Sequence, residues 1–550
     1  MTIRSIMLSG VAALTLISCG QSDDGASGAN NTEAARTNAS SPLDSTYRLK
    51  DGEQVDITAL LALFPSDTPP TYESAAFDDA LGANVITNLR FADADDGEAV
   101  IVERTEFYGV DLDALERVKT AAPSDDGAFE TIFEKIRFLN GKSEGYTEEG
   151  ESLLFSFAGI ELDKLQVREG GLSDENDAAI FDAISLAGVY AKDISLNVAP
   201  EDQAAVVFNA PDLRIVGIGG GKVDAVIAKD IDYTVAQTDA SREVLRQAMG
   251  PSAAFIFSGP LKSVISPDNQ EVSMQLFEWR DIDFSGLLPW TIKEEQPPFS
   301  EKNLLDLGTM KMVDIETSIS GKRVYSMGEA TVSALEFTWL APSKIRMDVK
   351  DAFYDYTAFV PEDAEDIFAA FQESGLDQVK GEGHFEWLWD EKSGKANMDY
   401  EANAEGFADF DMKLELGELE LADIERAAES GDPTALAALG TFDGFSLSLD
   451  DEKALDAIFS VAALQFGGSA EDLRQSAPAM IRLSGLQAAQ FNDRIPGYLG
   501  ALADFVSEGG KLTISAKPKT AITFNALQAQ VQTAPQDLPD VLNLTVTHEE

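Results

Sequence analysis

Met412-Lys413-Leu414-Glu415-Leu416 alternates apolar residues with charged ones, so that every second side chain is hydrophobic. A period of two is typical of a β-strand with one apolar face and one polar face. The same alternation recurs far away in the chain, at 231–235, 445–449 and 512–516. The sequence therefore predicts that strands of this kind form most of the protein.

Turn-forming residues join several of these expected strands. They stand between expected strands at 85–91 and 99–107 (Asp95-Asp96-Gly97), before a strand at 223–235 (Gly219-Gly220-Gly221), and after an aromatic strand that ends at Trp389 (Lys392-Ser393-Gly394). Short turns containing Gly connect antiparallel neighbours. We therefore expect hairpins and a mainly antiparallel sheet.

Helices are expected to be fewer and amphipathic. The clearest one ends at Gly467-Gly468, and its apolar side is formed by Leu455, Ile458, Phe459 and Phe466. Ser469 and Asp472 then have the spacing of a capping box for the next helix. Further helices are expected at 112–120, 129–139, 242–249, 364–373 and 498–506.

These patterns predict an α+β fold, with a long, twisted, mainly antiparallel β-sheet and amphipathic helices packed on one side. The Pro-rich stretch 288–300 is the best internal boundary. We therefore expect an N-terminal β-rich half at 46–290 and a C-terminal β-rich half at 300–550, with a helical segment at 450–508.

A short motif with Gly occurs five times in the expected strands. A large apolar residue is followed by any residue, then Gly, then another apolar residue, at 107–110, 157–160, 186–189, 284–287 and 442–445. Gly inside a strand often marks a bulge or bend, and repeated bends would curl a long sheet. Two interpretations remain open: a curved wall or groove, and ordinary strand kinks that helices cover.

The chain is strongly acidic. Its 550 residues contain 41 Lys and Arg against 96 Asp and Glu, a formal net charge of −55. Binding nucleic acid requires clustered cations, so the composition excludes nucleic acid as an expected partner. Hydrophobic residues make up 44% of the chain, which is enough for a folded core.

Residues 1–18 have the pattern of a bacterial secretion signal. The apolar run at 6–17 is too short to cross a bilayer as a helix, and Leu16-Ile17-Ser18-Cys19 resembles the lipobox of bacterial lipoproteins. That resemblance implies cleavage before Cys19, lipidation of its thiol and acylation of the new amino terminus. Residues 19–45 are rich in small polar residues, which predicts a flexible linker after the lipidated Cys19.

The leader also predicts where the protein resides. Cys19 is the only cysteine in the chain, so no intramolecular disulfide is expected. Gly20, rather than Asp, follows it, which favours the outer membrane over retention in the inner membrane. We therefore expect a body that is lipid-anchored in the bacterial cell envelope, on a periplasmic or surface-facing side that the sequence leaves open.

The last 130 or so residues resemble a family of uncharacterised exported proteins of alphaproteobacteria. The resemblance rests on Leu447-Ser448-Leu449-Asp450 before the expected helix, on Gly510-Lys511-Leu512-Thr513-Ile514-Ser515-Ala516, and on Leu542-Asn543-Leu544-Thr545-Val546-Thr547. The family has no assigned activity, so the resemblance implies no catalytic residue.

Few residues are suited to catalysis. The chain has two histidines, and alternation places His384 and Glu386 on one face of an expected strand, where they could form an acid–base or metal pair. A solvated or hydrogen-bonded strand residue is the commoner role, and we expect it for His384. His548 lies in an expected terminal strand. Two histidines and one lipidated cysteine do not provide a His-rich zinc site.

Two other motifs are superficial matches to ligand-binding loops. Gly219-Gly220-Gly221-Lys222 resembles a phosphate-binding loop, but Val223 stands where Ser or Thr must reach magnesium. The acidic stretch Asp93 to Gly97 fails as an EF-hand, because Ala would occupy the first and third ligand positions. We interpret both as hairpin turns and expect no cofactor and no metal.

We expect a non-enzymatic, lipid-anchored envelope protein that binds a lipid or another hydrophobic ligand along an apolar β-sheet face. One alternative is a structural or adhesive scaffold that contacts other envelope proteins without a ligand. A less favoured alternative is a carboxylate-dependent hydrolase, because the 96 acidic residues allow pairs that a linear sequence cannot show.

Overall fold

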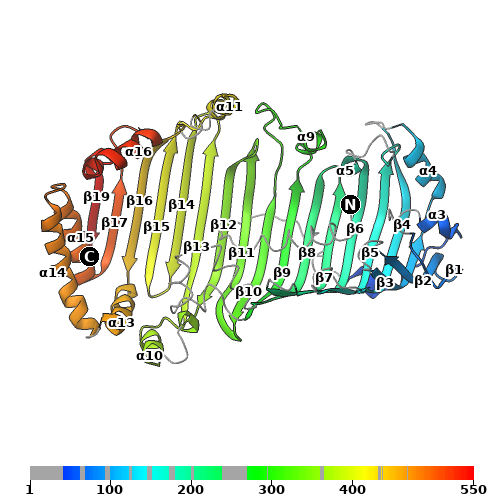
Figure 1. Cartoon of the computed structure of the whole chain (residues 1–550), viewed down its shortest axis with the longest axis horizontal. Helices are drawn as coiled ribbons and strands as arrows, with labels where there is room; N and C mark the ends of the chain where they lie inside the picture. Colours follow the sequence, from blue (N-terminus) through cyan, green and yellow to red (C-terminus); the bar gives the residue numbers. More distant parts are fainter. Residues whose placement is uncertain are drawn as a thin grey trace.

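The computed structural model describes residues 41–61, 69–92, 99–122, 127–144, 152–172, 180–199, 204–237, 269–293, 295–359, 365–430, 435, 438–466 and 469–550. Within these ranges the strands form one open sheet of 19 strands, and all their named pairings are antiparallel. Figure 1 shows this sheet running the length of the molecule. The prediction of a mainly antiparallel sheet is confirmed.

The first nine strands pair in sequence order. They are β1 (Ser74–Asp78), β2 (Ala83–Ala92), β3 (Ala99–Tyr108), β4 (Phe129–Glu144), β5 (Ser152–Arg168), β6 (Ile184–Ala199), β7 (Ala205–Gly219), β8 (Lys222–Ala236) and β9 (Asn269–Asp283). The expected hairpin turn at Gly219–Gly221 joins β7 to β8. The expected turn at Asp95–Gly97 lies outside the described residues.

The sheet continues from β9 directly to β10, and only its last three strands leave sequence order. β17 pairs with both β16 and β19, and the short β18 pairs with β16. These strands are β10 (Thr309–Ile319), β11 (Lys322–Thr338), β12 (Ala341–Tyr354), β13 (Val379–Asp390), β14 (Lys395–Ala404), β15 (Ala408–Gly417), β16 (Thr441–Asp451), β17 (Gly510–Ala516), β18 (Ile522–Thr523) and β19 (Leu544–Glu549).

The Pro-rich stretch at 288–300 is a connection at the end of the strands. It includes the short helix α9 (Leu288–Ile292), while β9 and β10 on either side of it pair along their whole length, from Arg280 with Thr309 to Gln270 with Ile319. The two halves expected from the sequence therefore share one uninterrupted sheet.

Helices lie beyond the strand ends and at the two ends of the sheet, as Figure 1 shows. We expected them packed on one side of the sheet, but the helices of the described residues form no continuous layer along it and cover its inner face only at the two ends. They are α3 (Ile57–Leu61), α4 (Leu112–Thr120), α5 (Ile180–Ala183), α10 (Glu365–Glu373), α11 (Leu421–Glu429), α13 (Ala454–Phe466), α14 (Ala470–Ala488), α15 (Ile495–Glu508), α16 (Phe524–Thr533) and α17 (Leu538–Val541).

Several predicted helices are confirmed. The expected helix at 112–120 is α4, the one at 364–373 corresponds to α10, and the one at 498–506 lies within α15. Ser469 caps α14 by accepting a hydrogen bond from the backbone N–H of Asp472, as the capping-box spacing predicts. The expected helix at 242–249 and the stop at Gly467-Gly468 lie outside the described residues.

The expected helix at 129–139 is wrong, because this segment is strand β4. Its apolar residues Ile132, Phe133 and Ile136 have the spacing of residues on one side of a helix. In β4 the neighbours Ile132 and Phe133 both join the buried core, because the pairing register with β5 shifts between Thr131 and Phe133. A β-bulge therefore imitates helical spacing in the sequence.

Two rows of residues with left-handed backbone conformation cross the sheet and crease it. The first row places Asn or Asp at positive φ near the middle of every even strand from β2 to β12: Asn88, Asn140, Asp193, Asp230, Asp314 and Asp351, with φ between 47° and 54°. The registers on either side place these residues at one level, for example Asp230 and Asp314 on either side of Gln275. Asn and Asp tolerate this conformation better than other residues with a side chain.

The second row crosses each strand six positions away from the first, and its left-handed residues lie on the odd strands. Lys164, Gly217 and Asp281 have φ of 46°, 66° and 59°. Gly217 lies opposite Asp224, and a Cβ at position 217 would lie only 2.0 Å from Oδ2 of the Asp224 carboxylate. Gly82, Gly109 and Gly308, also at positive φ, continue the row at the ends of β2, β3 and β10.

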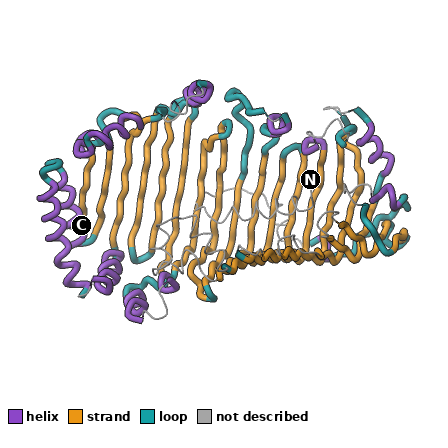
Figure 2. Tube along the Cα trace, viewed as in Figure 1, coloured by secondary structure: helices purple, strands orange, loops and turns teal. Residues whose placement is uncertain are grey.

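The creases turn the sheet into a trough. At the first crease each strand places two consecutive residues on the outer face, so the inner apolar positions skip from Ala228 to Ile231 and from Met312 to Ile315. Figure 2 shows strands of the N-terminal half lying flat and then turning end-on near their lower ends. The sheet is curved, but of the five motif glycines only Gly109 has a positive φ, and Asn and Asp make most of the bends.

Helices cover the inner face at both ends of the trough. At the N-terminal end, Leu60 of α3 and Val118 of α4 are fully buried against Ile86 and Leu89 of β2. At the C-terminal end, α13 and α15 pack on the inner face of β16, β17 and β19, chiefly through Leu455, Phe505, Val506 and Leu512. The expected helix face is only partly confirmed, because Leu455 is buried whereas Ile458 is 59% exposed.

Candidate functional site

The inner face of β6 to β15 is the candidate site, and we call it the apolar trough. In β13, β14 and β15 its side chains form cross-strand rows such as Phe385, Tyr400 and Met412. In β6 to β12 they form one cluster of Ile194, Leu196, Val198, Phe208, Ala210, Leu213, Val226, Ala228, Ile231, Tyr233, Val272, Met274, Phe277, Trp279, Met310, Met312, Ile315, Met327, Ala330, Val349, Ala352 and Tyr354. None of these side chains is charged.

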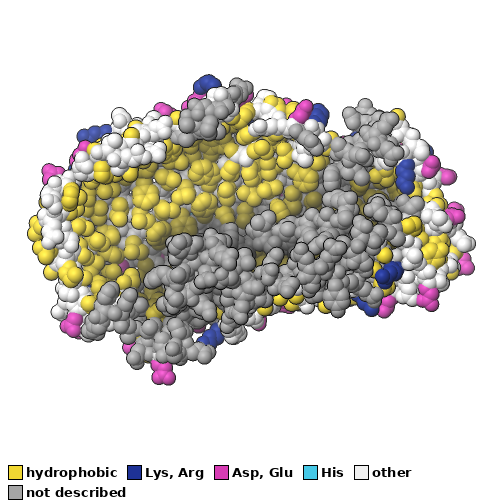
Figure 3. All heavy atoms as spheres, in the orientation of Figure 1, with side chains coloured by type: hydrophobic (Ala, Val, Ile, Leu, Met, Phe, Trp, Pro, Cys, Tyr) yellow, Lys and Arg dark blue, Asp and Glu magenta, His cyan; other side chains and the backbone are white. Residues whose placement is uncertain are grey.

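The outer face of the same strands carries the charge. The row next to Phe385, Tyr400 and Met412 consists of Glu386, Asp399 and Lys413. The Nζ of Lys413 lies 2.7 Å from Oδ1 of Asp399. Figure 3 shows the inner face as a broad, hollowed hydrophobic surface with charged side chains around its margin.

Tryptophans line one rim of the trough and are fixed by backbone acceptors. The indole N–H of Trp279 donates to the carbonyl of Leu307 at 2.6 Å, and that of Trp387 donates to the carbonyl of Pro342 at 2.9 Å. Trp389 likewise donates to Leu419 at 3.0 Å. Each ring therefore presents apolar surface to the trough while its polar atom is satisfied.

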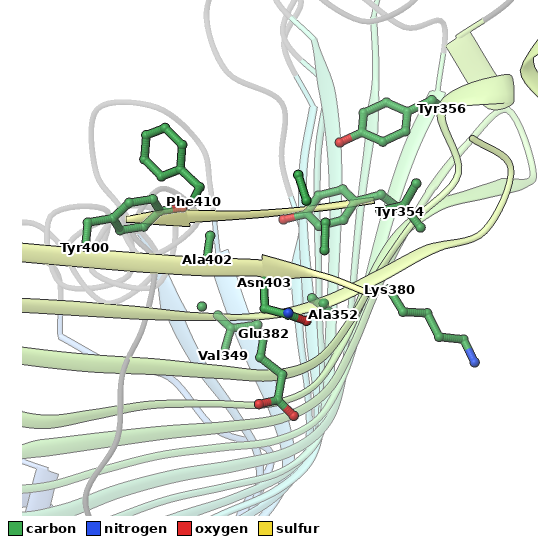
Figure 4. Close-up of a pocket in the computed structure, with 15 residues that line it drawn as sticks. Val349, Ala352, Tyr354, Tyr356, Lys380, Glu382, Tyr400, Ala402, Asn403 and Phe410 are labelled. Atoms are coloured by element: carbon green, nitrogen blue, oxygen red, sulfur yellow. The ribbon is translucent and has the colours of Figure 1, made fainter. Parts of the chain in front are cut away.

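A pocket of about 280 Å³ lies at the opposite rim, between β12 and β15. Tyr354 and Tyr356 form one wall, with ring centroids 6.0 Å apart and nearly parallel planes. Tyr400 and Phe410 form the other, with centroids 5.8 Å apart and an edge-to-face arrangement. Figure 4 shows these four aromatic side chains on the same side of the sheet, with small residues such as Ala402 between them.

The tyrosine hydroxyls of this region are partly desolvated. Burial, followed by the interaction with neighbouring Tyr354, raises the pKa of Tyr325 far above its ordinary value. Burial also raises the pKa of Tyr356 and of Tyr400. These phenols are neutral at physiological pH, so the pocket offers hydrogen-bonding groups without charge.

Buried ion pairs stiffen the outer face of the N-terminal half. Glu161 is fully buried and binds Lys135 and Arg137 of the neighbouring strand, with Nε of Arg137 at 2.6 Å. The Arg137 guanidinium also donates to the carbonyls of Ser45 at 2.7 Å and Pro42 at 2.9 Å. The chain is therefore fastened to the sheet from residue 41 onward, somewhat earlier than the expected end of the linker at residue 45.

The structure places His384 and Glu386 on the outer face of β13, as alternation predicts, but not as an isolated pair. Glu386 is bound by Arg346 of β12, and Nδ1 of His384 lies 3.9 Å from Oδ1 of Asp348. Burial raises the pKa of Asp348 to about 6, while His384 and Lys350 oppose the shift. His384 and the carboxylates of Asp348 and Glu386 all lie on the face opposite to the trough.

The other residues singled out in the sequence have structural contacts. Nε2 of His548 lies 2.7 Å from the carbonyl oxygen of Gly509, and Lys222 beside the triple-Gly turn forms an ion pair with Asp283 at 2.6 Å. The described part of the chain contains no cluster of His, Cys, Asp and Glu able to hold a metal ion. Cys19 and the acidic stretch at 93–97 lie outside it.

Sequence reasoning missed the tyrosine pocket. Tyr354 and Tyr400 occupy inner-face positions of strands whose other inner residues are mostly aliphatic, alanine or glycine. Polar-tipped aromatic residues at apolar positions of neighbouring strands were the available signal. The register that brings β12, β13 and β14 together could not be read from the sequence.

The comparisons with known proteins add a family match at the C-terminal end. Residues 401–549, from β14 to the last strand, match the model of a family described as "Uncharacterized protein". No curated protein matches the chain. No helix among the described residues is long and apolar enough to span a membrane.

Proposed function

We propose that this protein is a lipid-anchored, non-enzymatic protein of the bacterial cell envelope that binds a lipid or another hydrophobic ligand in the apolar trough. The observation that carries this proposal is the uncharged inner face of β6 to β15, in a chain with a net charge of −55. Eleven residues of its β6 to β12 part are buried, but Figure 3 shows an open hydrophobic hollow on this face, and a contiguous exposed apolar surface usually marks a binding site.

The dimensions of the trough suit acyl chains. Ten strands span nine inter-strand spacings of about 4.8 Å, or roughly 43 Å. One leaflet of a bilayer has a hydrocarbon thickness of about 15 Å, half of the whole core. The inner face of β6 to β15 therefore has room for more than one acyl chain.

The proposed anchor rests on the leader, where Leu16-Ile17-Ser18-Cys19 resembles a lipobox. Replacing Cys19 with Ser should abolish acylation and cleavage at this site, which mass spectrometry and detergent partitioning would detect. An unchanged mature mass and unchanged partitioning of Cys19→Ser would contradict lipidation. The membrane through this anchor, and other envelope proteins, are the proposed partners.

Binding can be tested on the chain from Gly20 onward, which contains every described residue. A pyrene-labelled hydrocarbon should bind saturably, and binding should persist in 1 M salt because no charge attraction is involved. Lipids that co-purify with this chain should be identified by mass spectrometry. Absence of saturable binding at micromolar protein would favour the scaffold alternative.

Adjacent residues of β14 provide matched variants. Met398 lies on the inner face and is half-buried, whereas Asn397 lies on the outer face and is exposed. Met398→Glu should weaken hydrocarbon binding at least about 10-fold, because a carboxylate in the trough must be desolvated. Asn397→Glu adds the same charge and should leave binding unchanged, with circular dichroism verifying both folds.

The non-enzymatic proposal makes a demand on His384, the residue best suited to proton transfer. His384→Gln should leave hydrocarbon binding and every cellular phenotype unchanged, because His384 lies on the outer face opposite Asp348. A phenotype without loss of folding or secretion would indicate a chemical task for this residue.

A further inference from the structure

The tyrosine pocket has a hollow floor and aromatic walls. Its floor consists of small residues of β12, β13, β14 and β15: Ala352, Gly381, Gly383, Ala402, Ala404 and Ala408. These residues leave space that larger side chains would fill, and a side chain at Gly381 would collide with the backbone of Asn403. The hollow is therefore built into the backbone arrangement of these strands.

The polar groups that face the pocket are phenols. Figure 4 shows Tyr354 and Tyr356 with their hydroxyl ends directed toward the side on which Tyr400 lies. The same view shows Glu382 and Lys380 pointing away from the aromatic side chains. Among the described residues that line the pocket, the tyrosines therefore direct hydroxyl groups toward a ligand, while Lys380 and Glu382 direct their charged ends away from it.

An anionic headgroup in this pocket would meet no inward-pointing cation among the described lining residues, because Lys380 points away. Burying an unpaired charge costs far more than burying a neutral group that is hydrogen-bonded. The net charge of −55 adds a long-range repulsion of anions. By contrast, a phenol can donate to an ester carbonyl or accept from a hydroxyl, both of which are neutral.

We propose that the tyrosine pocket receives the uncharged polar end of an acyl lipid, so that the trough selects neutral lipids of the diacylglycerol class over lipids that carry a phosphate. The proposal rests on the proposed function, because the acyl chains would lie in the apolar trough. Tyr354, Tyr356 and Tyr400 bind the glycerol hydroxyl and ester groups at the rim, where these groups remain near water.

The test measures displacement of the pyrene-labelled hydrocarbon from the chain that begins at Gly20. The competitors are a diacylglycerol and a phosphatidic acid with identical acyl chains, at 0.1 M and 1 M salt. We expect the diacylglycerol to bind at least about 10-fold more tightly at both salt concentrations. A preference for diacylglycerol that came from long-range repulsion alone would disappear at 1 M salt, where the Debye length is about 3 Å.

Hydroxyl deletions locate the selectivity. Tyr400→Phe and Tyr354→Phe keep the rings and should each weaken diacylglycerol binding about 2- to 10-fold, the worth of a neutral hydrogen bond. Tyr190→Phe is the matched control, since Tyr190 lies on the outer face of β6, in register with Glu161 of β5 and away from the pocket. The diacylglycerol affinity of each variant is compared with its own hydrocarbon affinity, so that loss of one hydroxyl group is separated from a change in the trough as a whole.

The outcomes separate the two proposals. Equal affinities for both lipids at 1 M salt, or diacylglycerol binding that is insensitive to both pocket variants, would overturn the selection of neutral lipids while hydrocarbon binding upholds the proposed function. Failure of the hydrocarbon itself to bind would overturn both.

Discussion

Replacing Asp230 with Ala tests whether the creases are set by residues that tolerate a left-handed backbone. Asp230 is exposed in β8 with φ of 51°, and Asp232, two positions along the same strand, is exposed without that conformation. The left-handed conformation costs an ordinary L-residue roughly 1–2 kcal/mol, and Asp avoids part of this cost. We therefore expect Asp230→Ala to lower the free energy of unfolding by about 1 kcal/mol.

Two companion variants isolate the backbone effect. Glycine adopts positive φ without steric cost, so Asp230→Gly should lie within about 0.5 kcal/mol of wild type. Asp232→Ala removes an equivalent carboxylate from an ordinary extended position and should also change stability by less than about 0.5 kcal/mol.

The effect can be amplified along the first crease. Successive even strands lie two inter-strand spacings, about 10 Å, apart. At this distance the changes in unfolding free energy caused by separate substitutions should be nearly additive. Ala at Asp193, Asp230 and Asp314 together should therefore lower the free energy of unfolding by about 3 kcal/mol. Urea unfolding followed by tryptophan fluorescence, with hydrogen exchange of β7 to β9 amides, measures this change. If Ala is as well tolerated at 230 as at 232, or if Gly destabilises as much as Ala, the left-handed backbone at Asp230 does not set the crease.

Three further predictions concern buried groups. Glu161→Gln should destabilise the protein by about 3–5 kcal/mol in urea unfolding, because it leaves the buried Arg137 without its anion and Lys135 with Asp163 alone, at 3.2 Å. Glu130→Gln, in a more exposed pair with Arg117, should cost under about 1 kcal/mol. Burial raises the pKa of Asp348 to about 6 in the folded protein, so between about pH 4 and 6 the folded state binds a proton that the unfolded state does not, and the free energy of unfolding falls as pH rises through that window. Asp348→Asn should flatten this part of the stability–pH profile. An unchanged slope would contradict the burial of the carboxyl. Phe505→Ala should cost about 3–5 kcal/mol and Ile458→Ala under about 1, and equal urea midpoints would contradict the packing of the C-terminal helices.

Period-two alternation predicted the strands well because each strand has one apolar face and one solvated face. Met412 and Leu414 face the trough and Lys413 faces outward, as the pattern indicates. The segment at 129–139 was misread because a bulge gave its apolar residues helical spacing. Ile458 was misplaced because helical periodicity cannot distinguish the side of α13 that meets the sheet from one that meets solvent.

The creases were harder to anticipate. Asp230 and Asp314 look like ordinary polar positions in strands, and only their alignment across neighbouring strands gives them a common role. That alignment depends on register, which a single sequence does not contain. The candidate site was hard to predict for the same reason, because the strands form a continuous uncharged face only when they are paired in the correct register.

The regular placement of the two creases separates the width of the trough from its length. Asp224 and Asp230 of β8 are six positions apart, as are Gln275 and Asp281 of β9. Each hairpin therefore repeats the same cross-section, and an added hairpin with this spacing would extend the trough by about 10 Å without reshaping its walls. Proteins built on this plan can vary in capacity by gaining or losing whole hairpins, in the way that repeat proteins vary by whole repeats.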